Sequence, residues 1–149
     1  MTFNEYETLC NQAIVLLNTE ANALLKSGDE QYQLQGVTLD LLFDEPQSVL
    51  SVVCHLGQPS DEHRTQVYEQ LLHLQMLSLH MPGVRFGYDP MLDEVLFCSS
   101  TKVSKDTPAN WLAKLMTTMT QQAEDWRSGL LDGQMAKAAA ELEEEMLAN

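Results

Sequence analysis

The spacing of apolar residues in the first part of the chain predicts an amphipathic helix. From Phe3 onward, apolar side chains recur every three or four residues, which places them on one face of a helix. Thr2 and Glu5 have the spacing of a capping box, in which each side chain accepts a hydrogen bond from the other residue's backbone N–H. We therefore expect a helix that begins near Thr2, runs to about Leu25 and ends before Gly28.

At Val37 the period of the pattern changes to two, which is typical of β-strands. In Val37–Phe43 every second residue is apolar, so this strand is expected to bury one face. Val49–Leu56 is apolar on both faces, as an interior strand of a sheet is. The segment Asp44–Gln47 between them consists of turn-forming residues, so the two strands are predicted to form a hairpin.

A second helix is predicted over Asp61–His80, with Ser60 as its N-cap residue. Its apolar stripe is wider than one face of a sheet requires, so we expect part of it to face a second copy of the chain. The candidate residues for this dimer interface are Val67, Leu71, Leu74 and Leu77.

The last part of the chain predicts a second hairpin and a long helix. Val84–Ser100 contains two strand-like runs around a turn, and a continuous apolar face follows from Pro108 to Gly133. Residues 134–149 are rich in Ala and Glu with few apolar positions, which predicts a marginal helix or a mobile tail. We therefore expect one α+β domain over residues 1–133, with an antiparallel sheet and the element order α-β-β-α-β-β-α.

The charge of the chain narrows the kinds of partner that it can bind. With 8 basic and 22 acidic residues among 149, the formal net charge is -14, which argues against nucleic acid and anionic membranes as partners. The opening residues lack the features of a signal peptide, and no apolar run is long enough for membrane insertion. The three separated cysteines, Cys10, Cys54 and Cys98, are typical of buried thiols in a reducing compartment, so a cytoplasmic location is expected.

A search for catalytic or metal-binding motifs yields no strong candidate. His73 and His80 lie on one predicted helix without a carboxylate at ligand spacing, and the glycines form no phosphate-binding loop. We therefore expect no metal, no cofactor and no enzymatic activity. A less favoured alternative is a small α+β hydrolase that uses carboxylates at strand ends as acid and base, with the candidates Asp40, Asp44, Glu45, Asp93 and Glu94.

Several local sequence patterns occur in an order that resembles a known family. They are Leu16–Asn18 with Leu24-Leu25, Gly36–Asp40, the predicted helix Val67–Leu79, Phe86–Asp89 and Ala123–Arg127. Over about residues 3–131, this acidic chain resembles the class I chaperones of type III secretion, the Tir chaperone family of Gram-negative bacteria. The Ala- and Glu-rich tail departs from the pattern of that family.

The resemblance implies a homodimer in which the first and third helices cover one side of a twisted antiparallel sheet. The second helix and a neighbouring strand form the two-fold dimer interface. It also implies that the protein binds the N-terminal segment of a secreted effector in extended form, keeps it soluble and presents it to the secretion apparatus, including its ATPase. A small acidic dimeric adaptor or inhibitory partner unrelated to secretion is the alternative for the same fold. Apolar positions that a one-sided core does not require are the candidate effector contacts, namely Leu16, Leu17, Leu24, Leu42, Val53 and Phe86.

Overall fold

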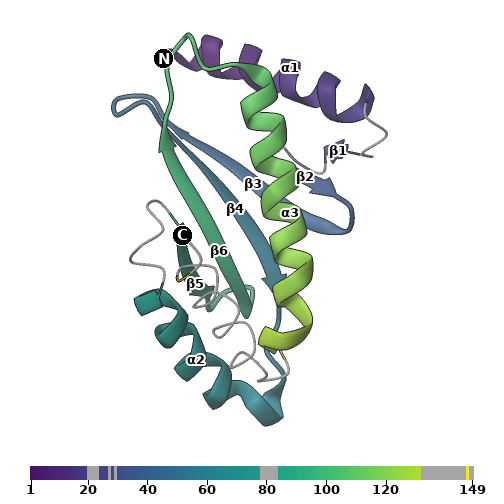
Figure 1. Ribbon diagram of the computed structural model, residues 1–149, viewed down its shortest axis with the longest axis vertical. Coiled ribbons are helices and arrows are strands. Elements are labelled where there is room, and N and C mark those ends of the chain that lie inside the picture. Colours follow the sequence, from purple (N-terminus) through teal and green to yellow (C-terminus); the bar gives the residue numbers. More distant parts are fainter. Residues whose placement is uncertain (20–23, 27, 29, 78–83, 132–146, 148–149) are drawn as a thin grey trace. The chain divides into compact units, whose positions relative to one another are not determined.

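A computed structural model shows three α-helices and a six-stranded sheet among the residues that it describes (Figure 1). These are residues 1–19, 24–26, 28, 30–77, 84–131 and 147, without the side chains of residues 19, 24–26, 77, 128 and 130. The sheet has the strand order β1-β2-β3-β4-β6-β5, so β1 and β5 are its edges. The elements are α1 (Phe3–Thr19), β1 (Leu24–Lys26), β2 (Gln31–Leu34), β3 (Val37–Asp44), β4 (Val49–Gly57), the 3₁₀-helix η1 (Asp61–His63), α2 (Arg64–Leu77), β5 (Val84–Asp89), β6 (Glu94–Lys102) and α3 (Ala109–Leu131).

The predicted α+β class with an antiparallel sheet is confirmed. β3 and β4 form the expected hairpin, with Leu41 opposite Val52. The alternation along β3 is also as predicted, because Leu39 and Leu41 are buried while Leu42 is 45% exposed. β4 lies between β3 and β6, which confirms that it is an interior strand.

The predicted end of the first helix is wrong. The capping box is present, since the Thr2 backbone N–H donates to Glu5 Oε1 over 2.8 Å, but α1 ends at Thr19. Leu24 lies instead in β1, where it pairs with Leu34 of β2. Pairing with the next strand thus decides the structure of a short apolar run whose spacing alone does not distinguish a helix from a strand.

The second strand, β2, was not predicted because its turn lacks the usual signal. Gln35 and Gly36 connect β2 to β3 and both have positive φ, at 51° and 79°. Such two-residue turns suit the twist of a hairpin, and Asn-Gly or Asp-Gly is their common signature. A Gln-Gly pair gives a much weaker signal, so the sequence pattern does not indicate this hairpin.

The boundaries of the later helices follow the prediction closely. Ser60 is the N-cap residue, with its Oγ accepting from the His63 backbone N–H over 3.3 Å, and η1 precedes α2. The predicted end of the second helix at His80 lies outside the described residues. The predicted tail also lies outside them, apart from Leu147.

The chain divides into two compact units, and the residues of β4, β6 and α3 are divided between them. Unit 1 comprises residues 1–54 and 99–121, and unit 2 comprises residues 55–98 and 122–149. The prediction of a single domain over residues 1–133 is not tested by this division. No helix in the described part of the chain is long and apolar enough to cross a membrane.

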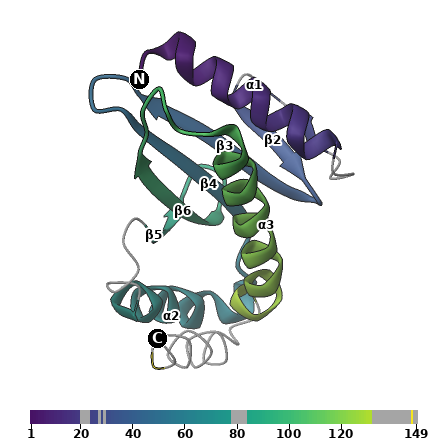
Figure 2. The same ribbon diagram turned by 45° about the horizontal axis from the view of Figure 1, so that its top comes forward.

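In unit 1, α1 covers one face of the sheet. Figure 2 shows the helix alongside β2 and β3. The Tyr6 ring stacks on Phe43 with ring centroids 4.7 Å apart, and its hydroxyl donates to the Leu41 carbonyl over 3.4 Å. Leu9 and Leu17 on the same helix are buried as well. The opposite face of β3 carries Leu42, so this face of the strand is open in unit 1.

In unit 2, an aromatic cluster packs between β5, β6 and α3. The Trp126 ring lies 5.0 Å from Phe86 and 5.2 Å from Phe97, measured between centroids. Arg127 on α3 donates from Nε to the Leu56 carbonyl over 3.0 Å, which fixes the helix against the end of β4. These contacts provide the frame on which α2 and β5 are held.

Candidate functional site

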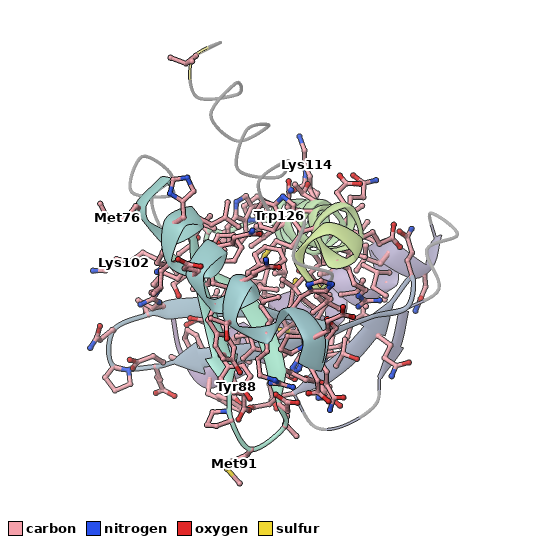
Figure 3. The ribbon with its side chains drawn as sticks, turned by 90° about the horizontal axis from the view of Figure 1, so that it is seen from below. Met76, Tyr88, Met91, Lys102, Lys114 and Trp126 are labelled. Atoms are coloured by element: carbon pink, nitrogen blue, oxygen red, sulfur yellow. The ribbon has the colours of Figure 1, made fainter. Side chains whose placement is uncertain are left out.

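Unit 2 contains an apolar hollow between α2 and β5, which we call the α2 hollow. Its volume is about 330 Å³. The rings of Tyr68 and Tyr88 form part of its wall, with their centroids 5.2 Å apart. Leu72 lies at its rim and is 71% exposed. Figure 3 shows Tyr88 on β5 and Met76 on α2. The lining residues are Tyr68, Leu71, Leu72, Gln75, Phe86, Gly87 and Tyr88.

A polar network at one end of this hollow ties α2 to the turn before β6. Arg64 Nη2 donates to Asp93 Oδ2 over 2.9 Å and to Asp61 Oδ1 over 2.9 Å, and Tyr88 also donates to Asp93. These hydrogen bonds, with that from Arg64 the strongest, lower the pKa of Asp93 to about 2. The hydrogen bond to Asp93 in turn raises the pKa of Tyr88. The network therefore stays ionised at neutral pH and positions the N-terminal part of α2.

A second polar contact closes part of the sheet edge in unit 2. Gln75 Oε1 on α2 accepts a hydrogen bond from the Phe86 backbone N–H over 2.7 Å. Because β5 is an edge strand, its outward N–H groups are otherwise available to an added strand. Gln75 occupies one of these donors, so strand addition at β5 requires the loss of this bond.

Unit 1 contains a larger open groove beside α1, which we call the α1 groove. Its volume is about 540 Å³. Val15 is 64% exposed here, while the flanking Asn11 and Gln12 supply amide groups. Amides beside exposed apolar carbons can hydrogen-bond to a peptide backbone while its side chains are buried. The lining residues are Thr8, Asn11, Gln12, Val15, Leu16 and Ala109.

The predicted effector contacts occupy different environments in the structure. Leu16 lines the α1 groove, whereas Leu17 is fully buried in the core of unit 1 and offers no surface to a partner. Leu42 and Val53 share the open face of the β3–β4 hairpin, since Val53 pairs with Asp40 and Leu42 follows two residues later. In unit 1, α1 covers the other face, so these two residues do not join Leu16 in one groove.

Two further predicted contacts are placed apart from these. The backbone of Leu24 lies in β1, and its side chain is outside the described residues. Phe86 is half-buried and lines the α2 hollow of unit 2. The six predicted contacts therefore do not form one continuous groove.

The predicted dimer stripe serves mainly as core in the structure. Val67 and Leu74 have no exposed surface and Leu71 is 8% exposed, while the side chain of Leu77 lies outside the described residues. These residues lie on one face of α2 as their spacing predicts, but this face is buried within the protomer. The exposed apolar side chains of α2 are instead Leu72 at 71% and Met76 at 65%.

The carboxylates proposed for a hydrolase each have a local structural partner or lie on a turn. In unit 1, Asp40 Oδ1 accepts from Gln31 Nε2 over 3.1 Å, and Asp44 Oδ1 accepts from the Gln47 backbone N–H over 3.4 Å. In unit 2, Asp93 is bound by Arg64, and Glu94 Oε2 lies 2.6 Å from His55 Nδ1. No three His, Cys, Asp or Glu side chains in the described ranges are grouped to hold a metal ion. His80 lies outside these ranges.

Sequence reasoning missed the residues that shape both surfaces. Arg64 and Asp93 are 29 positions apart, and no spacing rule connects them. No sequence pattern marks Gln75, whose amide oxygen accepts a hydrogen bond from an edge-strand N–H. Val15 also lines the α1 groove, but the sequence predicts only its neighbour Leu16 as a contact.

Comparison with known proteins gives both a fold and a family. The chain resembles a chain of the ExsC–ExsE complex, with a TM-score of 0.62 and 14% identity, covering 88% of this chain and 98% of that chain. It also resembles a chain of the HopA1–SchA chaperone–effector complex, with a TM-score of 0.58 and 16% identity, covering 83% and 94%. No curated protein sequence matches significantly. The family model of the Tir chaperone proteins matches residues 16–127, and the chain belongs to this Tir chaperone protein (CesT) family.

Proposed function

We propose that the protein is a type III secretion chaperone that binds the N-terminal segment of a secreted effector. The observation that carries this proposal is the match to the Tir chaperone family over residues 16–127. In this proposal the protein catalyses no reaction and needs no cofactor. It holds its client in an extended, soluble form that the secretion apparatus and its ATPase can accept, in the cytoplasm of a Gram-negative bacterium.

The surfaces of unit 1 support binding of an extended segment. The α1 groove offers Val15 and Leu16 to apolar side chains, and its amides offer hydrogen bonds to the client backbone. The open face at Leu42 and Val53 provides a second apolar contact. The edge strand β1 offers backbone donors and acceptors for strand addition. An unfolded segment can satisfy all three kinds of contact without folding by itself.

The α2 hollow of unit 2 supports the homodimer. Leu72 and Met76 expose apolar surface beside this hollow, and exposed apolar patches of this kind are typical of protein interfaces. In a two-fold dimer the same patch faces itself, so these residues cover each other. This assignment replaces the buried Val67 and Leu74 by neighbours on the same helix that have surface to offer.

The dimer is tested by light scattering at micromolar concentration. We expect a dimer for the unaltered protein and a folded monomer for Leu72→Asp and Met76→Asp, because each change places an unpaired charge in the interface. The matched control is Met91→Asp, since Met91 is 93% exposed at the tip of the turn before β6 (Figure 3). A monomeric unaltered protein contradicts this part of the proposal.

Client binding is tested by co-purification from a native host, followed by hydrogen exchange of the captured complex. We expect protection of one segment near the N-terminus of the captured protein and of the α1 groove in this chain. Val15→Asp should abolish capture, whereas the control Met91→Asp should retain it. Capture of a folded globular partner with no protected N-terminal segment would instead identify an adaptor or inhibitory partner.

A further inference from the structure

Unit 1 contains a second, smaller hollow on the side of α1 that faces β2, which we call the Tyr32 hollow. Its volume is about 280 Å³. This volume is just below the range of sites for drug-sized ligands, which begins at roughly 300 Å³, and it suits a single side chain. The residues that define its chemistry are Phe3, Tyr6, Glu7, Asn11, Glu30 and Tyr32.

Aromatic rings form rigid walls of this hollow. Tyr6 and Tyr32 are only 6% and 5% exposed, and the Phe3 ring lies 5.7 Å from Tyr6. The Tyr6 hydroxyl is engaged by the Leu41 carbonyl. Both tyrosine rings are therefore held in place by close packing, and they present fixed faces to the hollow.

The charge at the mouth of the hollow is negative. Glu7 and Glu30 both line it and are exposed, and neither forms an ion pair with a described basic side chain. Burial raises the pKa of Tyr32, and the nearby Cys10 thiol and Glu30 carboxylate raise it further. The hydroxyl of Tyr32 therefore stays protonated in a field that attracts cations and repels anions.

The Tyr32 hollow and the α1 groove meet at one residue. Asn11 lines both of them, with Glu7 one helical turn before it and Leu16 on the groove side. A peptide that crosses α1 at Asn11 can therefore insert a side chain into each hollow. The groove accepts an apolar side chain. The aromatic and acidic walls of the Tyr32 hollow suit a positively charged side chain of similar length.

We propose that the Tyr32 hollow binds a Lys or Arg side chain of the client segment, next to an apolar residue held in the α1 groove. The proposal rests on the proposed function, because the same segment fills both sites. The ammonium or guanidinium group lies against the rings of Phe3 and Tyr32 and pairs with Glu7 and Glu30. The hollow thus selects, among extended apolar segments, those that carry a basic residue beside the anchor.

The test uses two peptides and the full-length protein labelled with ¹⁵N. One peptide is acetyl-Leu-Gly-Arg-Gly-amide, and the other has citrulline, which is nearly isosteric and uncharged, in place of arginine. We expect the arginine peptide to shift the Asn11 and Tyr32 resonances and to bind about threefold to tenfold more tightly at low salt, from one cation–π contact and one exposed ion pair. Added salt should reduce this preference.

Charge-neutral variants locate the preference in the hollow. Glu7→Gln and Glu30→Gln should each reduce the difference between the two peptides, because each removes one carboxylate from its wall. Glu69→Gln is the matched control, since Glu69 is an exposed carboxylate on α2 in unit 2. A control that loses the preference as strongly as the hollow variants would show a general effect of net charge and overturn the proposal.

Other outcomes separate this proposal from the proposed function. Equal binding of both peptides, or no shift at Tyr32 with millimolar peptide, overturns the basic-residue pocket even if Val15→Asp abolishes client capture. If the protein still prefers the arginine peptide but Val15→Asp leaves client capture intact, the proposed role of the α1 groove is overturned instead. Lys26 pairs with Tyr32 through its backbone, so Lys26→Ala is also measured. A preference found only in that variant means that the chain's own lysine fills the hollow, and it overturns the proposal.

Discussion

The hollows beside α1 and α2 differ in how their walls are made. In unit 1, the α1 groove and the Tyr32 hollow mix apolar carbons with amides, tyrosine rings and carboxylates. In unit 2, the α2 hollow is lined mainly by aromatic and aliphatic side chains, and its one amide, Gln75, is bonded to the Phe86 backbone. The first kind of surface can recognise the backbone and charge of a peptide. The second offers shape and apolar area.

This difference matches the two tasks that the proposed function requires. A client segment is unfolded and must be chosen by a few side chains, so polar groups at its site add selectivity. A second copy of the same chain is folded and always has the same shape, so an apolar surface is sufficient. The predictions below test whether the two surfaces are as distinct as their walls indicate.

The largest expected effect separates core from surface on α2. Leu74 is fully buried and Leu72 is 71% exposed, although they are two positions apart. Leu74→Ala should lower the free energy of unfolding by roughly 2–5 kcal/mol, whereas Leu72→Ala should change it by about 0.5 kcal/mol or less in the monomeric state. Denaturant unfolding measures both values. Similar losses for the two variants would mean that Leu72 is not the exposed face of α2.

The same contrast exists on α1 and extends the comparison to unit 1. Leu17 is fully buried, whereas Leu16 lines the groove. Leu17→Ala should cost roughly 2–5 kcal/mol of stability, while Leu16→Ala should weaken client binding more than it weakens the fold. Calorimetric unfolding and capture of the client distinguish the two effects. Loss of client binding by Leu17→Ala without loss of stability would show that the assignments of these neighbours are reversed.

A smaller effect is expected at the edge of the sheet. Gln75→Leu removes the acceptor of the Phe86 N–H, and a lost hydrogen bond of this kind costs about 1 kcal/mol. Amide exchange at Phe86 should then become faster, while exchange in β3 stays unchanged. Gln70→Leu, at another position on α2, is the matched control. Unchanged exchange at Phe86 would show that Gln75 does not protect this edge.

The stability of unit 2 at acidic pH should depend on the network around Asp93. Its pKa falls from an ordinary value of 3.8 to about 2 in the folded protein. The ionised form is favoured by folding, so this stabilisation is complete above about pH 4 and is lost as the pH falls towards 2. Asp93→Asn should remove that part of the acid-induced loss, as measured by unfolding at several pH values. An unchanged acid profile would exclude Asp93 as its source.

The smallest effect concerns thiol reactivity. Cys10 and Cys54 are buried, whereas Cys98 is half-buried, so the expectation that all three are buried holds for only two. Labelling of the native protein should modify Cys98 first, because access limits the reaction of the thiolate. Occupation of the Tyr32 hollow should slow labelling of Cys10 further, since Cys10 lines that hollow. Mass spectrometry of the labelled peptides measures the order.

The sequence predicted the structure correctly where a pattern is compatible with only one local structure. The alternation in β3, the capping box of α1 and the N-cap Ser60 depend on neighbours a few positions away, so they could be predicted. The segment around Leu24 could not, because a strand of three residues is too short to show whether its apolar period is that of a strand or of a helix. Its identity is decided by pairing with Leu34.

The candidate sites were harder to predict because they depend on what a helix leaves uncovered. A stripe of apolar residues shows which side of a helix is apolar. It does not show how much of that side is buried against the sheet of the same protomer. On α2 that width includes Val67 and Leu74, and it leaves Leu72 and Met76 outside. The Tyr32 hollow brings Glu7 and Glu30 together from separate elements, so no local signal could have marked it.

The bond from Phe86 to Gln75 also bears on how many copies of this chain can associate. An edge strand with all donors free allows one sheet to continue into the next, and copies joined in this way can grow into a filament without a defined end. A side chain that occupies one of those donors makes each such step costlier by the loss of an internal bond. The proposed association through Leu72 and Met76, in contrast, closes on itself after one step. Gln75 thus favours a fixed stoichiometry over polymer growth, even in a cell that makes the protein in quantity.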